Sequence, residues 1–448
     1  MKILIILIII ILCIHKYKVY RKGFKSMNLL ELLEFNLKLL LINAAGLTDI
    51  NKTGSILLKL LTDDTTLVKF NRRLREKYGP VVSTYIITKS NFYYILDASF
   101  AKQMLIDSPH LFGPGKMKEH FFRQFMPNNV GISRCSMKAD RCPWNKMRQF
   151  NDAALGSVEM TPFYKCIGDI VKNSITTPLL NVYDFKQFSN RVAAESIYGS
   201  KDDTQNNENA ELIKTFMSSI DDNLLKSRFY KRYLKHLHEN YETAPHCSML
   251  HYANVYRNDA QNIIDDQIPH WFAPFVFMFS YLVPNLLCVI LNFKEIYTKI
   301  MNEMDNFDLL SKSTYLHYCV IEHIRLFNTI NINLQRTVEQ DMNYYGYDFK
   351  KGDQLFIGFA NILRDNSLFN NPDDFIPERW ASKPSEEQKI VFSVGPQQCP
   401  SRNISPVYYK AIIYHLLKNY SYKVESPKLK NKTLYFINPY NIRFSAEN

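Results

Sequence analysis

The stretch best suited to carry chemistry is a loop late in the chain, residues 392–402, which contains Cys399. Gly395 and Pro396 give it a turn-rich composition, and the apolar, aromatic run 407–417 that follows has helical character. A cysteine held just before a helix favours the thiolate, because free amides and the helix dipole stabilise an anionic sulfur. A lone cysteine is more often a small buried hydrophobic residue, so this interpretation needs support from the rest of the chain.

Two further pairs of polar residues occur at helical spacing. Trp144 and Arg148 share a helix face, so an indole N–H and a guanidinium could hold one carboxylate. A routine surface stack of arginine on tryptophan is the alternative. Glu322 and Arg325 also share a face. An exposed pair would contribute little to stability, whereas a buried pair with further hydrogen bonds would act as a structural lock.

Composition narrows the class of protein. The chain has 448 residues, of which 46% are hydrophobic and 14% aromatic, enough for a large core and unlike a disordered protein. The net charge of +12 is compatible with an anionic membrane or an acidic partner, but no basic stripe interleaved with aromatics favours nucleic acid. The eight cysteines form no CxxC pair or regular framework, and no zinc-type pair complements Cys135 and Cys142. We therefore expect mostly free thiols in a reducing compartment.

The N-terminus has the features of a membrane anchor. Residues 3–14 form an unbroken apolar run, shorter than the roughly 20 residues of a spanning helix, and basic residues follow it up to residue 25. Snorkelling of Lys16 and Lys18 would lengthen the run, and no small-x-small cleavage site follows it. We interpret residues 1–25 as an uncleaved signal anchor of a single-pass membrane protein. The positive-inside rule then leaves the main body cytoplasmic, on a membrane of the endoplasmic-reticulum type.

The remaining chain predicts a mainly α fold with small β-sheets, an α+β class. Residues 26–64 read as an amphipathic helix and linker, lying on the membrane or packed on the core, and residues 65–448 as the main domain. The apolar segment 263–291 is interrupted by three prolines, which favours a buried, kinked helix over a second membrane span. The expected elements are helices 67–77, 99–106 and 315–329, strands 81–88, 91–96, 336–338 and 354–359, and a proline-braced loop at 371–380.

Four motifs in this order resemble the cytochrome P-450 superfamily, the haem-thiolate monooxygenases, over about residues 65–425. Their order and spacing are more specific than any one of them. The motifs are Trp144-x-x-x-Arg148, Glu322-x-x-Arg325, Phe375-x-Pro377-Glu378-Arg379-Trp380 and Phe392-x-x-Gly395-x-x-x-Cys399.

The resemblance implies a cytochrome P-450-like fold that binds haem, with Cys399 as the thiolate ligand of the iron. Arg379 would complete the ion-pair lock of Glu322 and Arg325. The resemblance also implies a lipophilic small-molecule substrate, a flavin-containing reductase as electron donor, and a monomer. The cofactor-binding residues that it implies are Trp144, Arg148, Glu322, Arg325, Arg379, Phe392, Gly395, Gln397 and Cys399.

The chain also departs from the family's pattern. Gln397 and Ser401 occupy positions where the family usually has arginine and glycine around the cysteine. Val276 and Phe277 stand where an acid and an alcohol usually deliver protons to bound oxygen, and Ser280 is the substitute we expect.

Three functions therefore remain open. The first is a monooxygenase. The second is a haem-thiolate peroxide isomerase, dehydratase or peroxygenase. The third is a catalytically decayed membrane-bound binding or scaffold protein.

Overall fold

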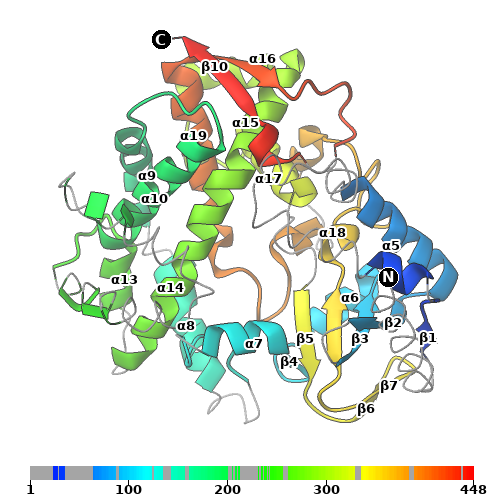
Figure 1. The fold of residues 1–448 in the computed structure, drawn as a ribbon. Helices are drawn as coiled ribbons and strands as arrows, with labels where there is room; N and C mark the ends of the chain where they lie inside the picture. Colours follow the sequence, from blue (N-terminus) through cyan, green and yellow to red (C-terminus); the bar gives the residue numbers. More distant parts are fainter. Residues whose placement is uncertain are drawn as a thin grey trace, which may run out of the picture.

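A computed structural model describes most of the chain (Figure 1). The described residues are 24–28, 30–35, 64–86, 90–123, 126–134, 143–156, 161–199, 204, 207–208, 210–211, 231, 234–235, 237–239, 241, 243–255, 261–327, 334–382, 388–434 and 437–447. The anchor predicted for residues 1–25 lies almost wholly outside them. Within the predicted amphipathic segment, residues 30–35 are helical, and Leu32 and Phe35 are buried against the sheet, which supports core packing for that turn.

One long helix runs through the middle of the fold (Figure 1). It consists of α14 (Gln261–Phe277), the π-helical turn η3 (Met278–Leu282) and α15 (Val283–Asn292). Pro269 and Pro274 lie inside α14, and each removes a backbone donor, which accounts for an irregular helix here. Among the described residues this is the one helix long and apolar enough to cross a membrane, but 65% of its most apolar window is buried, as expected for a core helix.

Several helices pack around this central helix, with α10 against α14 and η3, and α19 against α15, α9 and α17. Most apolar faces form one large core, while α5 packs on the sheet in a second, smaller cluster. The helices are α5 (Asp64–Tyr78), α6 (Ala98–Ile106), α7 (Lys116–Arg123), α8 (Pro143–Gly156), α9 (Thr161–Ser174), α10 (Val182–Tyr198), α13 (Met249–Val255), α16 (Lys294–Met301), α17 (Tyr315–Phe327), α18 (Phe359–Ile362) and α19 (Ile404–Asn419).

A six-stranded mixed sheet of order β1-β2-β3-β8-β5-β4 lies beside the helical part (Figure 1). Two further antiparallel sheets have two strands each, β6–β7 and β9–β10. Tyr345 and Gly346 both have positive φ in the β6–β7 turn, as a two-residue hairpin requires. The strands are β1 (Lys25–Ser26), β2 (Val81–Ile86), β3 (Ser90–Ile95), β4 (Phe112–Pro114), β5 (Leu334–Val338), β6 (Met342–Tyr344), β7 (Tyr347–Phe349), β8 (Gln354–Ile357), β9 (Ser421–Ser426) and β10 (Arg443–Glu447).

The structure confirms the mainly helical class with small sheets, and it corrects one expectation about the cysteines. Cys166 of α9 is disulfide-bonded to Cys247, just before α13, so the expectation of free thiols is wrong for this pair. The two lie 81 residues apart, and such a separation leaves no spacing signal in the sequence. The free cysteines among the described residues are Cys288, Cys319 and Cys399.

Candidate functional site

The Cys399 loop is held by its own backbone. It connects η7 (Gln388–Phe392) to η8 (Pro400–Arg402), and α19 follows directly. The Cys399 amide donates to the carbonyl of Phe392 at 3.0 Å, which closes the loop at its base. Gln398 donates from its amide to the Gly395 carbonyl at 3.0 Å and from its side chain to the Ser393 carbonyl at 3.1 Å. These bonds fix where the sulfur is presented.

Gly395 is the residue of this loop that admits no side chain. Its φ is +76°, and a Cβ there would lie 2.4 Å from the carbonyl oxygen of Leu105, at the end of α6. Both the backbone conformation and the contact with backbone atoms therefore require glycine. The loop is seated against the end of α6 through this contact.

Replacing Gly395 with alanine is expected to destabilise the protein more than the same change at Gly346, which has φ +86° and nothing within 4 Å of an added Cβ. Gly346→Ala would lower the unfolding free energy only by the left-handed backbone cost, about 1–2 kcal/mol. Gly395→Ala would lower it by roughly 1–3 kcal/mol more, because the added Cβ forces the loop and α6 apart. Urea unfolding of the two variants measures the difference. Equal losses of unfolding free energy in the two variants would show that the loop is not in close contact with α6.

Burial dominates the protonation of Cys399 and raises the pKa of its thiol above the usual value. The Ser401 amide that donates to the sulfur, and then Arg148 and Arg402, oppose this rise, while Asp152 adds to it. Arg148 is held on α8 by an ion pair with Asp152 at 2.8 Å. One backbone donor and two cations thus partly offset the effect of burial.

Helix α8, which carries Trp144 and Arg148, is in direct contact with η8 at the end of the cysteine loop. Such a contact is needed if these residues and Cys399 belong to one site. A Cβ on Gly156, at the end of α8, would lie 2.9 Å from the carbonyl oxygen of Pro400. Trp144 is buried beside Val130 on the first turn of the same helix. The structure thus brings Arg148 to the Cys399 region and seats Trp144 in its own small cluster.

Glu322 and Arg325 form a fully buried ion pair on α17. Two hydrogen bonds of 2.8 Å join the guanidinium to the carboxylate, and both side chains are 0% exposed. The remaining donors of Arg325 reach backbone carbonyls of the loop before η6 (Pro377–Trp380), including Pro372 at 2.7 Å. Burying two charges is favourable only when such bonds satisfy them, so this pair locks α17 to the loop.

The loop completes the same carboxylate from the other side. Arg379 donates to Glu322 at 3.0 Å, Trp380 donates from its indole nitrogen at 2.9 Å, and the Ile376 amide donates at 2.9 Å. Burial opposes ionisation of Glu322, but Arg325 and Arg379 outweigh it and hold its pKa below the usual value. The three-residue lock expected from the sequence is present.

Three basic residues that the sequence analysis did not single out lie close together: Lys118 of α7, His270 of α14 and Arg336 of β5. Lys118 keeps an exposed side chain, and His270 and Arg336 are half-buried. The surrounding protein lowers the pKa of Lys118 to about 8, of His270 to about 3 and of Arg336 to about 10. Lys118 also lowers the pKa of His270, and Arg336 that of Lys118.

None of the three has an ion pair among the described residues, and Arg336 Nε is buried without a hydrogen-bond partner there. Clustered cations without a counter-charge are complementary to an anionic group. Lys118, His270 and Arg336 lie on three different elements and form no spacing pattern along the chain. The sequence alone therefore did not indicate them.

One face of the central helix keeps accessible surface. His270, Pro274 and Met278 follow each other at steps of four and are accessible, while Trp271 and Phe275 beside them are buried. The absence of an acid–alcohol pair stays a prediction from the sequence.

Ser280 does not lie on that face. It is 0% exposed, and its hydroxyl donates to the Ser189 hydroxyl of α10 at 3.1 Å. The π-helical turn, which the sequence did not predict, changes the phase of the helix at this residue. We therefore no longer propose Ser280 as a proton donor. Gln397 and Phe392 remain half-buried in the cysteine loop.

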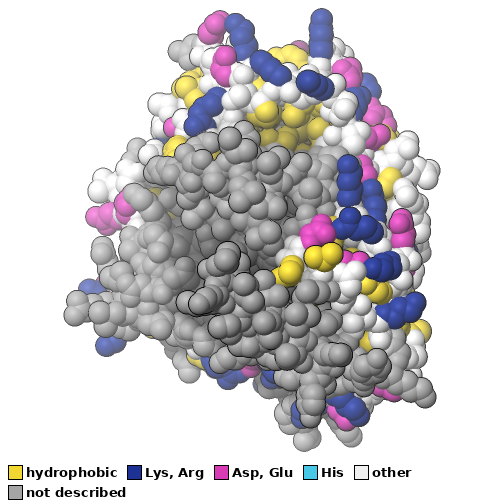
Figure 2. Space-filling model, turned by 45° about the vertical axis from the view of Figure 1, so that its right-hand side comes forward, with side chains coloured by type: hydrophobic (Ala, Val, Ile, Leu, Met, Phe, Trp, Pro, Cys, Tyr) yellow, Lys and Arg dark blue, Asp and Glu magenta, His cyan; other side chains and the backbone are white. Residues whose placement is uncertain are grey.

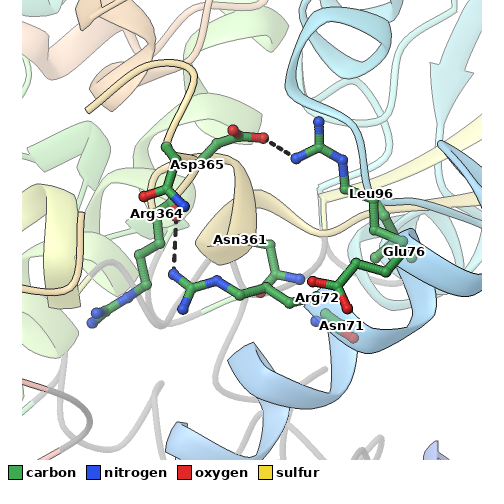
Figure 3. Close-up of a pocket in the computed structure, with 9 residues that line it drawn as sticks. Asn71, Arg72, Glu76, Leu96, Asn361, Arg364 and Asp365 are labelled. Atoms are coloured by element: carbon green, nitrogen blue, oxygen red, sulfur yellow. Dashed lines mark hydrogen bonds and ion pairs between the residues drawn. The ribbon is translucent and has the colours of Figure 1, made fainter. Parts of the chain in front are cut away.

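A separate pocket of about 220 Å³ lies between α5 and the segment after α18 (Figure 3). Its arginines are engaged, Arg72 with Asp373 at 2.8 Å and Arg75 with Asp97 at 2.7 Å and with Asp365. On the described part of the face in Figure 2, lysines and arginines lie among aspartates, glutamates and hydrophobic side chains. The pocket does not involve the thiol, so the Cys399 loop and its neighbouring charges are the candidate site.

Comparisons with known proteins agree with this geometry. The family model described as Cytochrome P450 matches residues 289–444, which include the lock and the cysteine loop. Over 85% of this chain and 99% of the other, the fold superposes on a zebra fish cytochrome P450 structure with abiraterone at a TM-score of 0.67 and 12% identity. The C-terminal third of the chain thus matches the Cytochrome P450 family model, and the described fold is that of a cytochrome P450. A second cytochrome P450 structure (CYP102L1) covers 86% of this chain and 99% of the other, with a TM-score of 0.68 and 15% identity.

Curated P450 relatives match only part of their length. Psoralen synthase of Pastinaca sativa is 28% identical over 124 residues, 27% of this chain and 26% of the relative. The mitochondrial cholesterol side-chain cleavage enzyme of Hypanus americanus is 27% identical over 30% of this chain and 27% of its own. The cytochrome P450-like protein L532 of Acanthamoeba polyphaga mimivirus is 31% identical over 30% and 31%. The match therefore spans about a quarter to a third of these relatives.

The match to the Cytochrome P450 family model implies a haem cofactor, and the residues present fit one. Cys399 supplies a half-buried sulfur near Arg148 and Arg402, which suits a thiolate ligand for iron. Lys118 and Arg336 supply cations that have no ion pair among the described residues, which suits the two propionates of the porphyrin.

Proposed function

We propose that this protein is a haem-thiolate oxidoreductase that inserts oxygen into a lipophilic small molecule. The observation that carries the proposal is the Cys399 sulfur, presented by its loop and flanked by the Ser401 amide, Arg148 and Arg402. Bound haem would supply the oxygen chemistry, and a thiolate ligand favours O–O cleavage. The protein's own part is to hold the ligand, neutralise the propionates and orient the substrate.

The residues around the cofactor divide these tasks. Cys399 would bind the iron, Lys118 and Arg336 would bind propionates, and Arg148 would lower the pKa of the thiol from α8. Trp144 and Gln397 would hydrogen-bond the propionates, as the family's motifs imply. The buried lock of Glu322 holds the loop that precedes the cysteine segment, so its role is positioning rather than chemistry.

Electron supply and location follow from the same proposal. We infer a flavin-containing reductase as partner, since a net charge of +12 suits docking of an acidic protein. We also infer attachment to an endoplasmic-reticulum-type membrane by residues 1–25, from which a lipophilic substrate could enter, with the protein acting as a monomer.

A second reaction class has a specific observation in its favour. The accessible face of the central helix carries His270, Pro274 and Met278 and, among its described side chains, no acid or alcohol to deliver protons to bound oxygen. A peroxide isomerase, dehydratase or peroxygenase does not need that delivery. Comparing NADPH consumption with a reductase against turnover driven by hydrogen peroxide separates the two. Turnover in the peroxide arm alone would replace the monooxygenase proposal, and failure to incorporate haem would leave the binding or scaffold function.

Haem affinity is expected to fall as pH rises above about 8. Lys118, with its pKa lowered to about 8, loses its proton there, whereas a neighbouring propionate favours the protonated amine. Binding haem therefore takes up a proton above pH 8, and below it this residue adds no pH dependence. Transfer of haem to a scavenging apoprotein, measured across this range, tests the prediction. Lys118→Gln should flatten the profile and the surface variant Lys69→Gln should not; an unchanged slope in Lys118→Gln would contradict it.

A further inference from the structure

The pocket between α5 and the segment after α18 has polar walls, and none of the residues that line it belongs to the cysteine loop (Figure 3). Its volume of about 220 Å³ gives room for a small molecule rather than for a single water. Leu96 is buried and supplies an apolar wall, whereas Glu76 and Asn366 are exposed, so the pocket opens to solvent beside them.

The positive charges of this pocket are already neutralised. Three arginines line it, and each forms an ion pair with at least one of three aspartates. The arginines are Arg72, Arg75 and Arg364, and the aspartates are Asp97, Asp365 and Asp373. An anion that entered the pocket would therefore have to displace an aspartate from its arginine.

Further hydrogen bonds hold these ion pairs in place. Arg364 is 3% exposed and donates to the carbonyls of Leu326 and Leu434, both at 2.9 Å. Arg72 also donates to the carbonyl of Arg364 at 3.1 Å. The walls of the pocket are thus preorganised, which reduces the entropy lost when a ligand binds.

Three oxygen-bearing side chains of the pocket have acceptors to spare. Asn71 is 2% exposed and donates from its amide nitrogen to the Tyr94 hydroxyl at 2.7 Å, but its Oδ1 has no partner among the described residues. Asn361 Oδ1 is also buried without a hydrogen bond there, and the Glu76 carboxylate forms no ion pair in the described part of the chain. Buried acceptors without partners cost free energy, so they are complementary to a ligand that brings donors.

The arrangement of these acceptors fits one kind of group. Figure 3 shows the Glu76 carboxylate turned toward the side chains of Asn361 and Asn71, so three acceptors and one unbalanced negative charge face a common space. An ammonium group carries one positive charge and three N–H donors and has no acceptor, which matches both features. Within the described ranges no group of three His, Cys, Asp or Glu side chains could hold a metal ion, which favours an organic cation.

We propose that this pocket binds a small organic amine in its protonated form. Glu76, Asn71 and Asn361 accept hydrogen bonds from the ammonium group, and a short alkyl chain lies against Leu96. The site is separate from the proposed haem site, so its occupancy does not depend on the proposed function.

Three probes with the same number of carbon atoms test this: butylamine, 1-butanol and butyrate. Dissociation constants for the full chain are measured by saturation-transfer NMR, and the haem absorption spectrum is recorded in the same titration, because an amine can also ligate haem iron. The wild type should bind the protonated butylamine about 10-fold more tightly than the other two probes. Glu76→Gln should weaken butylamine binding about 10-fold and leave the haem spectrum as in the wild type. Asn361→Asp adds a second carboxylate and should tighten it.

The control is Glu425→Gln on β9, which removes the same charge from an exposed position outside the pocket and should leave all three affinities unchanged. An unchanged affinity for butylamine in Glu76→Gln would overturn the proposal, as would equal binding of 1-butanol or butyrate by the wild type. Absence of saturable butylamine binding would overturn it as well and show that water satisfies the two asparagine oxygens. A wild type without haem would overturn the proposed function instead, while the dependence of amine binding on Glu76 would still decide this inference.

Discussion

Replacement of Cys399 with serine is expected to abolish the carbon-monoxide difference band of thiolate-ligated haem in the reduced protein. The hydroxyl of serine is a much weaker donor than a thiolate, and it ionises far less readily than a thiol. The loop itself should persist, since its closing bonds are made by the backbone of Cys399 and by Gln398. The spectrum of the purified, reduced protein measures the effect.

Cys288→Ala provides the matched control, because Cys288 is also free and buried but lies on α15 and has its thiol pKa raised to about 12 by burial. That variant should keep the band. A band retained by Cys399→Ser, or lost equally in Cys288→Ala, would remove the assignment of the iron ligand. If the wild type binds haem without the band, the thiolate is not the ligand.

Glu322→Ala is expected to cost about 3–5 kcal/mol of unfolding free energy, enough to unfold many domains of this size. The change leaves Arg325 and the Arg379 guanidinium without their carboxylate in the interior, together with the indole N–H of Trp380 and the Ile376 amide. Urea unfolding, or soluble yield where the variant does not fold, gives the measure.

Lys299→Ala is the control for the lock, because it removes an exposed ion pair with Glu378 of the same loop. A pair of this kind contributes at most about 1 kcal/mol, so this variant should be close to wild type. Glu322→Gln should be intermediate, since it keeps acceptors for the donors and loses the charge. Soluble, haem-loaded Glu322→Ala with wild-type stability would contradict the structural role of the lock.

The sequence predicted the features that are written as local spacing. Glu322 and Arg325 share a helix face because they are three residues apart, and Gly395 marks a turn that only glycine can make. Both survive in the structure because helix periodicity and backbone sterics are local effects. The same reasoning located most helices and strands of residues 64–106 and 315–357.

Features that depend on tertiary packing were not predictable in this way. Lys118 and Arg336 meet only because α7 packs on β5, and Cys166 meets Cys247 only because α9 and the segment before α13 lie together. Ser280 is a residue that the sequence indicated but the structure places elsewhere. It was the expected substitute for the proton-delivering pair, and the π-helical turn directs its hydroxyl to Ser189 of α10. No residue pattern predicts this change of helix phase.

The π-helical turn at Met278–Leu282 has a consequence for how this protein can vary. A π turn is equivalent to one residue inserted into an α-helix, and each residue of an α-helix advances the chain by about 100°. Deleting one residue from this turn would restore an uninterrupted α-helix and swing α14 by that angle relative to α15. His270 and Pro274 would turn away from their present positions together, and the buried rings of Trp271 and Phe275 would leave the core. Inserting or deleting one residue in this turn would therefore disrupt the packing of α14, whereas a substitution would not rotate the helix. The length of this helix is thus more strongly constrained than its amino-acid composition.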